Sequence, residues 1–185
     1  MRHALPILAA ALLLAGCSAE RDAPPSTAAP AAAAAAPARP APPEFRLPLV
    51  TAAGESTLAD AVKAAGGRPL VLVLGSASCG DSTRELEDLA ASMPPYAVLC
   101  VVEGSPAEVR GTLPKSVPFP VAADADGGTL EAYGVSITPS VVVLDGKGGV
   151  AYQGDGGYIR PAAIADMAAK VARGEPVGEI ETEGG

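Results

Sequence analysis

The sequence predicts a layered α/β fold with a partly parallel central sheet. Two observations support this prediction: three apolar runs without a polar interruption, and segments of helical spacing between and after them. Strands that are buried on both faces of a sheet have continuous runs of Val, Ile and Leu, and parallel neighbours need a crossover connection. We therefore expect a central mixed sheet flanked by helices.

The apolar runs give the strands of this sheet. They cover residues 69–75, 96–102 and 140–144, and each is expected to be a buried strand. Residues 145–149, Asp-Gly-Lys-Gly-Gly, are typical of a hairpin turn. The turn leads into residues 150–153, which we expect to form an antiparallel strand near the edge of the sheet.

Two segments have a clear apolar helical face. In the helix after the first run, this face consists of Leu86, Leu89, Ala90 and Met93, and the N-cap is one of Asp81, Ser82 or Thr83. The last helix begins behind Pro161, a residue that suits a first helical turn, and its apolar face consists of Ile164, Met167, Ala168 and Val171.

Three shorter helices are expected as well. Thr57 and Asp60 have the spacing of a capping box, and the glycines at 66–67 would stop the helix that follows. Residues 105–112 and 128–134 have weaker helical patterns.

The N-terminus resembles a bacterial lipoprotein signal peptide, residues 1–16. An apolar run over residues 4–14, too short to span a bilayer, leads into Leu14-Ala15-Gly16-Cys17, which resembles a lipobox. This resemblance implies acylation of Cys17 and a lipid anchor facing the periplasm. Ser18, where inner-membrane lipoproteins usually carry Asp, favours the outer membrane in a cell with two membranes. The alternative is an ordinary signal peptide in which Cys17 has no role.

Composition divides the rest of the chain. Residues 17–43 are expected to be a disordered tether, because residues 23–43 contain eleven Ala and seven Pro. Residues 44–175 are expected to form the folded domain, and residues 176–185 an acidic tail. The chain has 21 Asp+Glu against 13 Lys+Arg and no basic cluster, which excludes nucleic acid as a partner and limits membrane contact to the lipid anchor.

Histidine and cysteine usage restricts the chemistry. The one histidine is His3, inside the signal peptide, so Ser-His and Cys-His catalysis and a His-ligated metal site are excluded. We expect no metal and no cofactor. Once Cys17 is acylated, only Cys79 and Cys100 are available for sulfur chemistry, which an oxidising compartment permits.

Three stretches resemble the thioredoxin-like superfamily. These are the apolar strand leading to Cys79 (71–82), the segment ending in Tyr-Gly-Val (119–135), and the Thr-Pro strand (137–149). The sequence is most similar to the redoxin and TlpA-like branch, related to AhpC/TSA proteins, over roughly residues 44–175. The resemblance implies a thioredoxin-like fold and redox chemistry at Cys79.

The resemblance also implies the arrangement of the site. Pro139 should be cis, with Thr138 beside Cys79 and its backbone available to a substrate strand. Ser82 stands in the place of the second, resolving cysteine, and Gly75 and Ser78 stand where the family usually has tryptophans. A Cys-x-x-Ser site can attack a disulfide but cannot release its partner by internal attack.

The thiol of Cys79 is expected to have a lowered pKa. At the junction of a strand and a helix it meets unpaired backbone N–H groups and the positive end of the helix dipole. Ser82 can donate a hydroxyl hydrogen bond to it, whereas the carboxylate of Asp81 would repel a thiolate and Arg84 would offset Asp81. Cys100 is either a core residue, a resolving thiol or the partner of Cys79 in a disulfide.

Three functions fit these residues. The first is a membrane-anchored thiol–disulfide oxidoreductase that acts through Cys79 on thiols and disulfides of the cell envelope. The second is a peroxiredoxin-like peroxidase, since Ser76-Ala-Ser-Cys79 matches part of that motif and Arg160 could steady a peroxide, although Leu72 stands where the motif has proline. The third is a non-catalytic binding module. The sequence leaves the oligomeric state open.

Overall fold

The structure is a computed structural model that describes residues 40–154, 156–178, 180 and 182. The expected signal peptide and nearly all of the expected tether lie outside these residues. None of the described helices is both long and apolar enough to cross a membrane. The described elements follow in the order β1 (Arg46–Pro48), β2 (Glu55–Thr57), α1 (Leu58–Ala65), β3 (Leu70–Ser76), α2 (Gly80–Ser92), β4 (Ala97–Glu103), α3 (Pro106–Thr112), β5 (Val121–Asp124), α4 (Gly128–Ala132), β6 (Ser140–Leu144), β7 (Val150–Gln153) and α5 (Pro161–Ala172).

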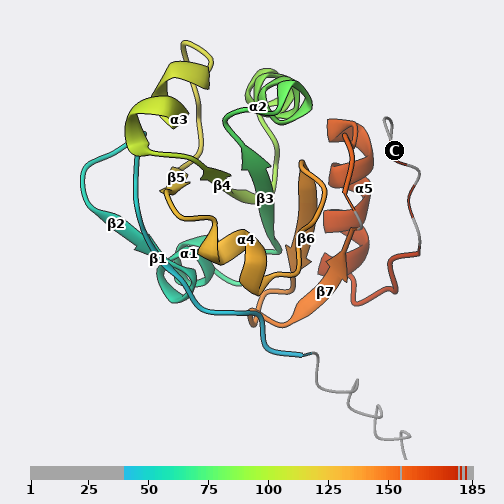
Figure 1. The fold of residues 1–185 in the computed structure, drawn as a ribbon. Helices are drawn as coiled ribbons and strands as arrows, with labels where there is room; N and C mark the ends of the chain where they lie inside the picture. The colour runs from blue at the N-terminus through green and yellow to red at the C-terminus, as the bar shows by residue number, and fades with distance from the viewer. Residues whose placement is uncertain (1–39, 155, 179, 181, 183–185) are drawn as a thin grey trace, which may run out of the picture. The chain divides into compact units, whose positions relative to one another are not determined.

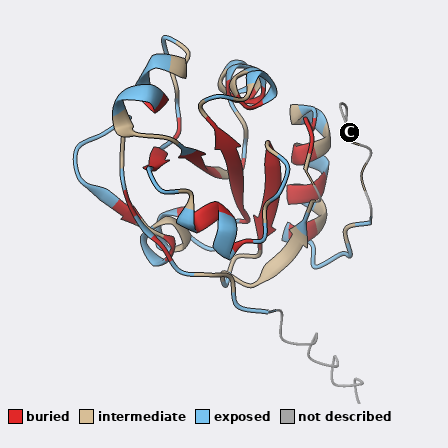
Figure 2. Cartoon of the chain, in the orientation of Figure 1, coloured by how far each residue is buried: buried red, intermediate tan, exposed pale blue. Residues whose placement is uncertain are grey.

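Five of these strands form one mixed sheet in the order β5-β4-β3-β6-β7. β3, β4 and β5 run parallel, whereas β6 is antiparallel to both β3 and β7. The three apolar runs of the sequence are the central strands β3, β4 and β6, and every residue of β3 and β6 is buried. The predicted mixed sheet is confirmed, and Figure 2 shows these strands as the buried interior.

Helices cover both faces of the sheet (Figure 1). On one face, α2 and α5 bury residues such as Leu89 and Met167 in a shared apolar cluster. On the other face, α1 and α4 do the same with residues such as Leu58 and Leu130. Each fully buried side chain of this size contributes about 1.5–3 kcal/mol to folding. The sheet is thus packed against helices on both faces, and the loops at its ends extend from buried strands.

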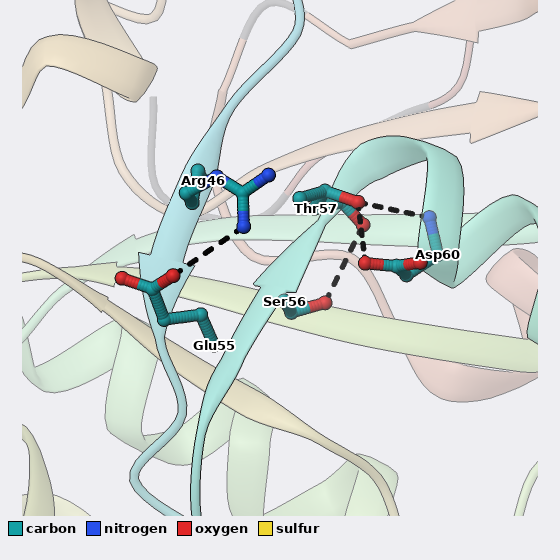
Figure 3. Close-up of polar contacts among 5 residues, drawn as sticks. All are labelled: Arg46, Glu55, Ser56, Thr57 and Asp60. Atoms are coloured by element: carbon teal, nitrogen blue, oxygen red, sulfur yellow. Dashed lines mark hydrogen bonds and ion pairs between the residues drawn. The ribbon is translucent and has the colours of Figure 1, made fainter.

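The capping prediction for α1 is confirmed. The Asp60 backbone N–H donates to Oγ1 of Thr57 at 3.0 Å, and the Thr57 hydroxyl donates to the Asp60 carboxylate at 2.7 Å (Figure 3). The helix ends at Gly66, whose left-handed φ of 62° suits glycine. Figure 3 also shows the 3.4 Å ion pair between Arg46 of β1 and Glu55 of β2. Both side chains are exposed, so this pair adds little to stability.

The predicted N-cap of α2 is wrong. The sequence pattern favoured Asp81, Ser82 or Thr83, but the helix begins at Gly80 and Cys79 is its N-cap residue, without a capping hydrogen bond from its side chain. The turn after β3 takes only three residues, so the helix starts early. The Ser82 hydroxyl oxygen accepts from the backbone N–H of Ser76 at the end of β3, at 3.2 Å, and not from its own helix.

Met93 departs from the expected apolar face of α2. It is the C-cap residue, with a left-handed φ of 45°, and 74% of it is exposed. The left-handed turn directs it away from the face that Leu86 and Leu89 bury. In the expected acidic tail, Val177 and Ile180 pack against the apolar cluster of α2 and α5.

Three short strands were not predicted. β1 and β2 form a two-stranded antiparallel sheet, and β5 is an edge of the main sheet. The backbone that follows β1 covers this edge, because Leu49 bridges Ala122 and the Val50 N–H donates to the Val121 carbonyl at 2.8 Å. Protected edges of this kind resist pairing with other chains.

Candidate functional site

Cys79 lies in the turn between β3 and α2, at the carboxyl end of the central strand. Its thiol is partly buried and donates to the carbonyl oxygen of Thr138, with an Sγ–O distance of 3.3 Å. The Thr138–Pro139 peptide bond is cis. The residues expected at the site, Cys79, Ser82, Thr138 and Pro139, are therefore gathered at this end of the sheet.

The surroundings of Cys79 favour its thiolate. Burial acts to raise the pKa of the thiol, but hydrogen bonds from the side chain and backbone of Ser82, from the Thr138 side chain and from the Asp81 backbone together hold it below its ordinary value. The carboxylate of Asp81 is not among the groups that shift this pKa, although repulsion from it was expected. A partly exposed cysteine with a lowered pKa has the properties of a nucleophile.

Ser82 is held in place from two sides. It is 2% exposed, and its Oγ accepts from the Ser76 backbone N–H. A Cβ atom at Gly75 would lie 3.1 Å from both Cβ and Oγ of Ser82. The Ser76 N–H uses one lone pair of the Ser82 hydroxyl oxygen and leaves the hydroxyl proton unused. Ser82 can therefore donate this proton to Sγ of Cys79. The absence of a side chain at Gly75 leaves the room in which Ser82 sits.

Cys100 lies in the interior of the sheet, away from this turn. It is fully buried in β4 and pairs in register with Val73, three residues before the end of β3 at Ser76. At about 3.3 Å per residue, Val73 and its partner Cys100 lie roughly 10 Å along the strand from Ser76, after which the chain continues to Cys79. Both cysteines are free thiols, and burial raises the pKa of Cys100 well above its ordinary value.

The sequence singled out two arginines, Arg84 and Arg160. The Arg84 guanidinium is 4.1 Å from the ring centroid of Tyr158, and its Nε is 3.9 Å from Oδ2 of Asp88. Arg160 is the N-cap residue of α5. Neither guanidinium is among the groups that shift the pKa of Cys79. The structure therefore does not assign either arginine to the thiol.

A buried carboxyl at Glu85 was missed by the sequence analysis. It is fully buried in α2, and neither carboxyl oxygen has a hydrogen-bond partner among the described residues. Burial, with a contribution from the charge of Asp88, raises the pKa of Glu85 to about 8, although the nearby backbone of Ile159 opposes the rise. Its spacing of four residues from the core residue Leu89 was the signal that it faces inward.

The described residues contain no group of three or more His, Cys, Asp or Glu side chains that could hold a metal ion. A protein-bound metal therefore has no candidate site in this part of the chain.

Comparisons with known proteins agree on the family and fold. The family model described as AhpC/TSA matches residues 38–153. No curated protein matches the sequence significantly. A hypothetical protein of Sinorhizobium meliloti is similar in structure, with TM-score 0.60 and 20% identity over 78% of this chain and 89% of its own.

Two further solved structures that are similar to this chain belong to redox proteins. The exposed lipoprotein thioredoxin of Streptococcus pneumoniae has TM-score 0.55 and 22% identity, over 69% of this chain and 99% of its own. A secreted disulfide oxidoreductase of Mycobacterium tuberculosis has TM-score 0.56 and 16% identity, over 68% of this chain and 94% of its own. At these identities the likeness is one of fold, and the fold is thioredoxin-like.

Proposed function

Because the chain belongs to the AhpC/TSA family within the thioredoxin-like superfamily, we propose that it is a thiol–disulfide oxidoreductase with one attacking thiol, Cys79. The observation that supports this most directly is the lowered pKa of a partly exposed cysteine at the N-terminus of α2. The two named structural relatives, a thioredoxin and a disulfide oxidoreductase, make the same reaction class the first to test.

The reaction begins when the Cys79 thiolate attacks one sulfur of a substrate disulfide. A bond forms between Sγ and that sulfur, the substrate S–S bond breaks, and the other half leaves as a thiolate that takes up a proton. Ser82 has no sulfur with which to attack the resulting mixed disulfide. A second, external thiolate must attack the substrate sulfur of this mixed disulfide, so that a new disulfide forms between the external thiol and the substrate while the Cys79 thiolate leaves and is restored.

Thr138 and Pro139 are the proposed substrate-binding residues. The Thr138 carbonyl already lies within hydrogen-bond distance of Sγ, so a substrate strand that reaches the sulfur would run along this loop. Cys100 is left out of the cycle, because it is fully buried and its pKa is raised.

The location in the cell is also part of the proposal. Residues 1–16 would be removed as a signal peptide, Cys17 would carry the lipid, and residues up to 43 would link the anchor to the domain, 44–175. The protein would then face the periplasm, with the outer membrane favoured by Ser18. The pneumococcal relative, described as an exposed lipoprotein, is consistent with such an anchor.

A peroxidase is the second candidate, favoured by the AhpC/TSA match itself. It needs a group that steadies the peroxide beside Cys79, and Arg160 was the residue expected to do so. Among the described residues, no arginine is one of the groups that shift the pKa of Cys79, so we place this candidate second.

One experiment separates these functions. The full chain carrying Cys17→Ser is alkylated with iodoacetamide across pH, and separate samples are treated with glutathione disulfide or hydrogen peroxide and analysed by intact mass. We expect a low-pKa thiol and a glutathione adduct on Cys79. Fast sulfenic acid formation without that adduct would favour the peroxidase, and an unreactive thiol of ordinary pKa would favour a binding module.

A further inference from the structure

A hollow of about 410 Å³ lies beside the turn that carries Cys79. Its walls come from the ends of β3 and β4, from α4 and from the segment that leads to Pro139. Ser78 and Thr138, which line it, are the chain neighbour and the hydrogen-bond partner of Cys79. A group bound in this hollow would therefore be close to the sulfur under attack.

The lining of the hollow is polar and acidic. Four hydroxyl side chains and two carboxylates contribute to it, and no lysine or arginine does: Ser76, Ser78, Ser136 and Thr138, with Glu103 and Glu131. Within the described part of the chain, neither glutamate forms an ion pair or a side-chain hydrogen bond. Ionised carboxylates accept hydrogen bonds and donate none, so the hollow matches a group that is both cationic and a donor.

The position of Glu103 is defined by a glycine. Gly127, at the start of α4, has a left-handed φ of 71°, and a Cβ atom there would lie 3.2 Å from Oε1 of Glu103. The carboxylate at the end of β4 is therefore directed toward α4, the helix that carries Glu131. The two carboxylates enter the hollow from different elements, β4 and α4.

We propose that this hollow is a subsite for a cationic group next to the disulfide that Cys79 attacks. The substrates would be disulfides with an ammonium or guanidinium group near the reacting sulfur, such as a cystine flanked by Lys or Arg. This inference rests on the proposed function and adds its substrate class. A metal ion is a poor alternative occupant, because no group of three ligating side chains exists among the described residues.

Three small disulfides of different charge test the proposal: cystamine (cationic), bis(2-hydroxyethyl) disulfide (neutral) and 3,3′-dithiodipropionate (anionic). The full chain with Cys17→Ser is mixed with each, and the rate of adduct formation on Cys79 is measured by intact mass. Each rate is divided by that of free glutathione with the same reagent. We expect cystamine to be favoured over dithiodipropionate by about tenfold at low salt, and less at high salt.

Charge-neutral variants locate the effect. Both glutamates are exposed, so Glu103→Gln and Glu131→Gln should each lower the cystamine preference about threefold, the size of an exposed ion pair. Glu87→Gln, which removes an exposed carboxylate from α2, is the matched control and should leave the preference unchanged. Alkylation by neutral iodoacetamide should be equal in all four proteins, which rules out an effect through the Cys79 pKa.

The outcomes separate the subsite from the reaction. A preference that is absent, or that survives both glutamine variants, overturns the subsite and leaves the oxidoreductase proposal standing. If no disulfide reacts, the oxidoreductase proposal fails, and the subsite is then tested with cationic 2-bromoethylammonium against anionic iodoacetate. A cation preference that Glu103→Gln and Glu131→Gln lower, but Glu87→Gln does not, supports the subsite, and any other pattern overturns it.

Discussion

Ser82 lies directly against Gly75, so that a Cβ atom at position 75 would come within 3.1 Å of its Cβ and Oγ. The end of β3 and the first turn of α2 are thus fitted to each other at the point where a resolving cysteine would stand. A larger side chain at position 82 therefore fits only while position 75 stays glycine.

Ser82→Cys should convert the domain into a disulfide reductase that releases its product. A thiol at position 82 would take the place of the hydroxyl that lowers the Cys79 pKa, and the open space at Gly75 accommodates a sulfur atom. We expect insulin reduction with dithiothreitol as the electron source to rise at least tenfold above the wild type, which should stall as a mixed disulfide.

Thr83→Cys is the control for this gain, because it adds the same thiol one residue further along α2. Equal activity of Ser82→Cys and wild type, with both folded, would contradict the proposed geometry.

Ser82→Ala should raise the pKa of the Cys79 thiol toward its ordinary value. The hydroxyl that stabilises the thiolate is removed, and the Ser76 N–H loses its acceptor, which should cost about 1–3 kcal/mol of folding free energy. The pH dependence of iodoacetamide alkylation measures the first effect, and urea unfolding the second. Thr83→Ala removes a hydroxyl that bonds the Cys79 carbonyl and not its sulfur, so it should leave the pKa unchanged.

Glu85 should make the domain less stable as the pH rises from about 5 to 8. Burial raises the pKa of this carboxyl from 4.5 to about 8, so the folded state keeps the proton that the unfolded state has lost within this window. The resulting loss of stability between the two pKa values reaches on the order of 3 kcal/mol by pH 7, at about 1.4 kcal/mol per pH unit.

Glu85→Gln should therefore abolish this slope in urea unfolding at pH 5, 6, 7 and 8. Glu87→Gln, on the exposed side of the same helix, should retain it. A slope that persists in the Glu85→Gln protein would mean that other groups bind the protons.

Cys17→Ser should release the protein from membranes without unfolding it. The lipid would be attached at residue 17, whereas the first strand of the described domain begins at Arg46. Fractionation after a carbonate wash measures the release, and Cys79→Ser is the control that should stay with the membrane. Retention of the Cys17→Ser protein in the membrane fraction would contradict the lipoprotein proposal.

The sequence predicted the elements whose burial is complete and missed those that depend on distant partners. β3, β4 and β6 were predicted to within one residue, because strands buried on both faces have uninterrupted apolar runs. β5 was missed because Val-Ala-Ala-Asp is a short segment with weak strand preference, and it is covered by the chain that follows β1.

The site shows the same division. The resemblance located Cys79, Ser82, Thr138 and Pro139, since each belongs to a recognisable local motif. The inward direction of Glu85 and the position of Glu103 over Gly127 depend on how helices meet the sheet. Nothing in the local residue order specifies those contacts.

The complete burial of Cys100, set against the partial exposure of Cys79, gives the domain two built-in chemical probes. Under native conditions a membrane-impermeant alkylating reagent reaches one sulfur and reports the reactivity of the site. The other sulfur is labelled only when the sheet opens, so its labelling rate follows global unfolding. A single mass spectrum at increasing denaturant would then separate damage to the chemistry from damage to the fold, in the same tube and for any variant that retains both cysteines.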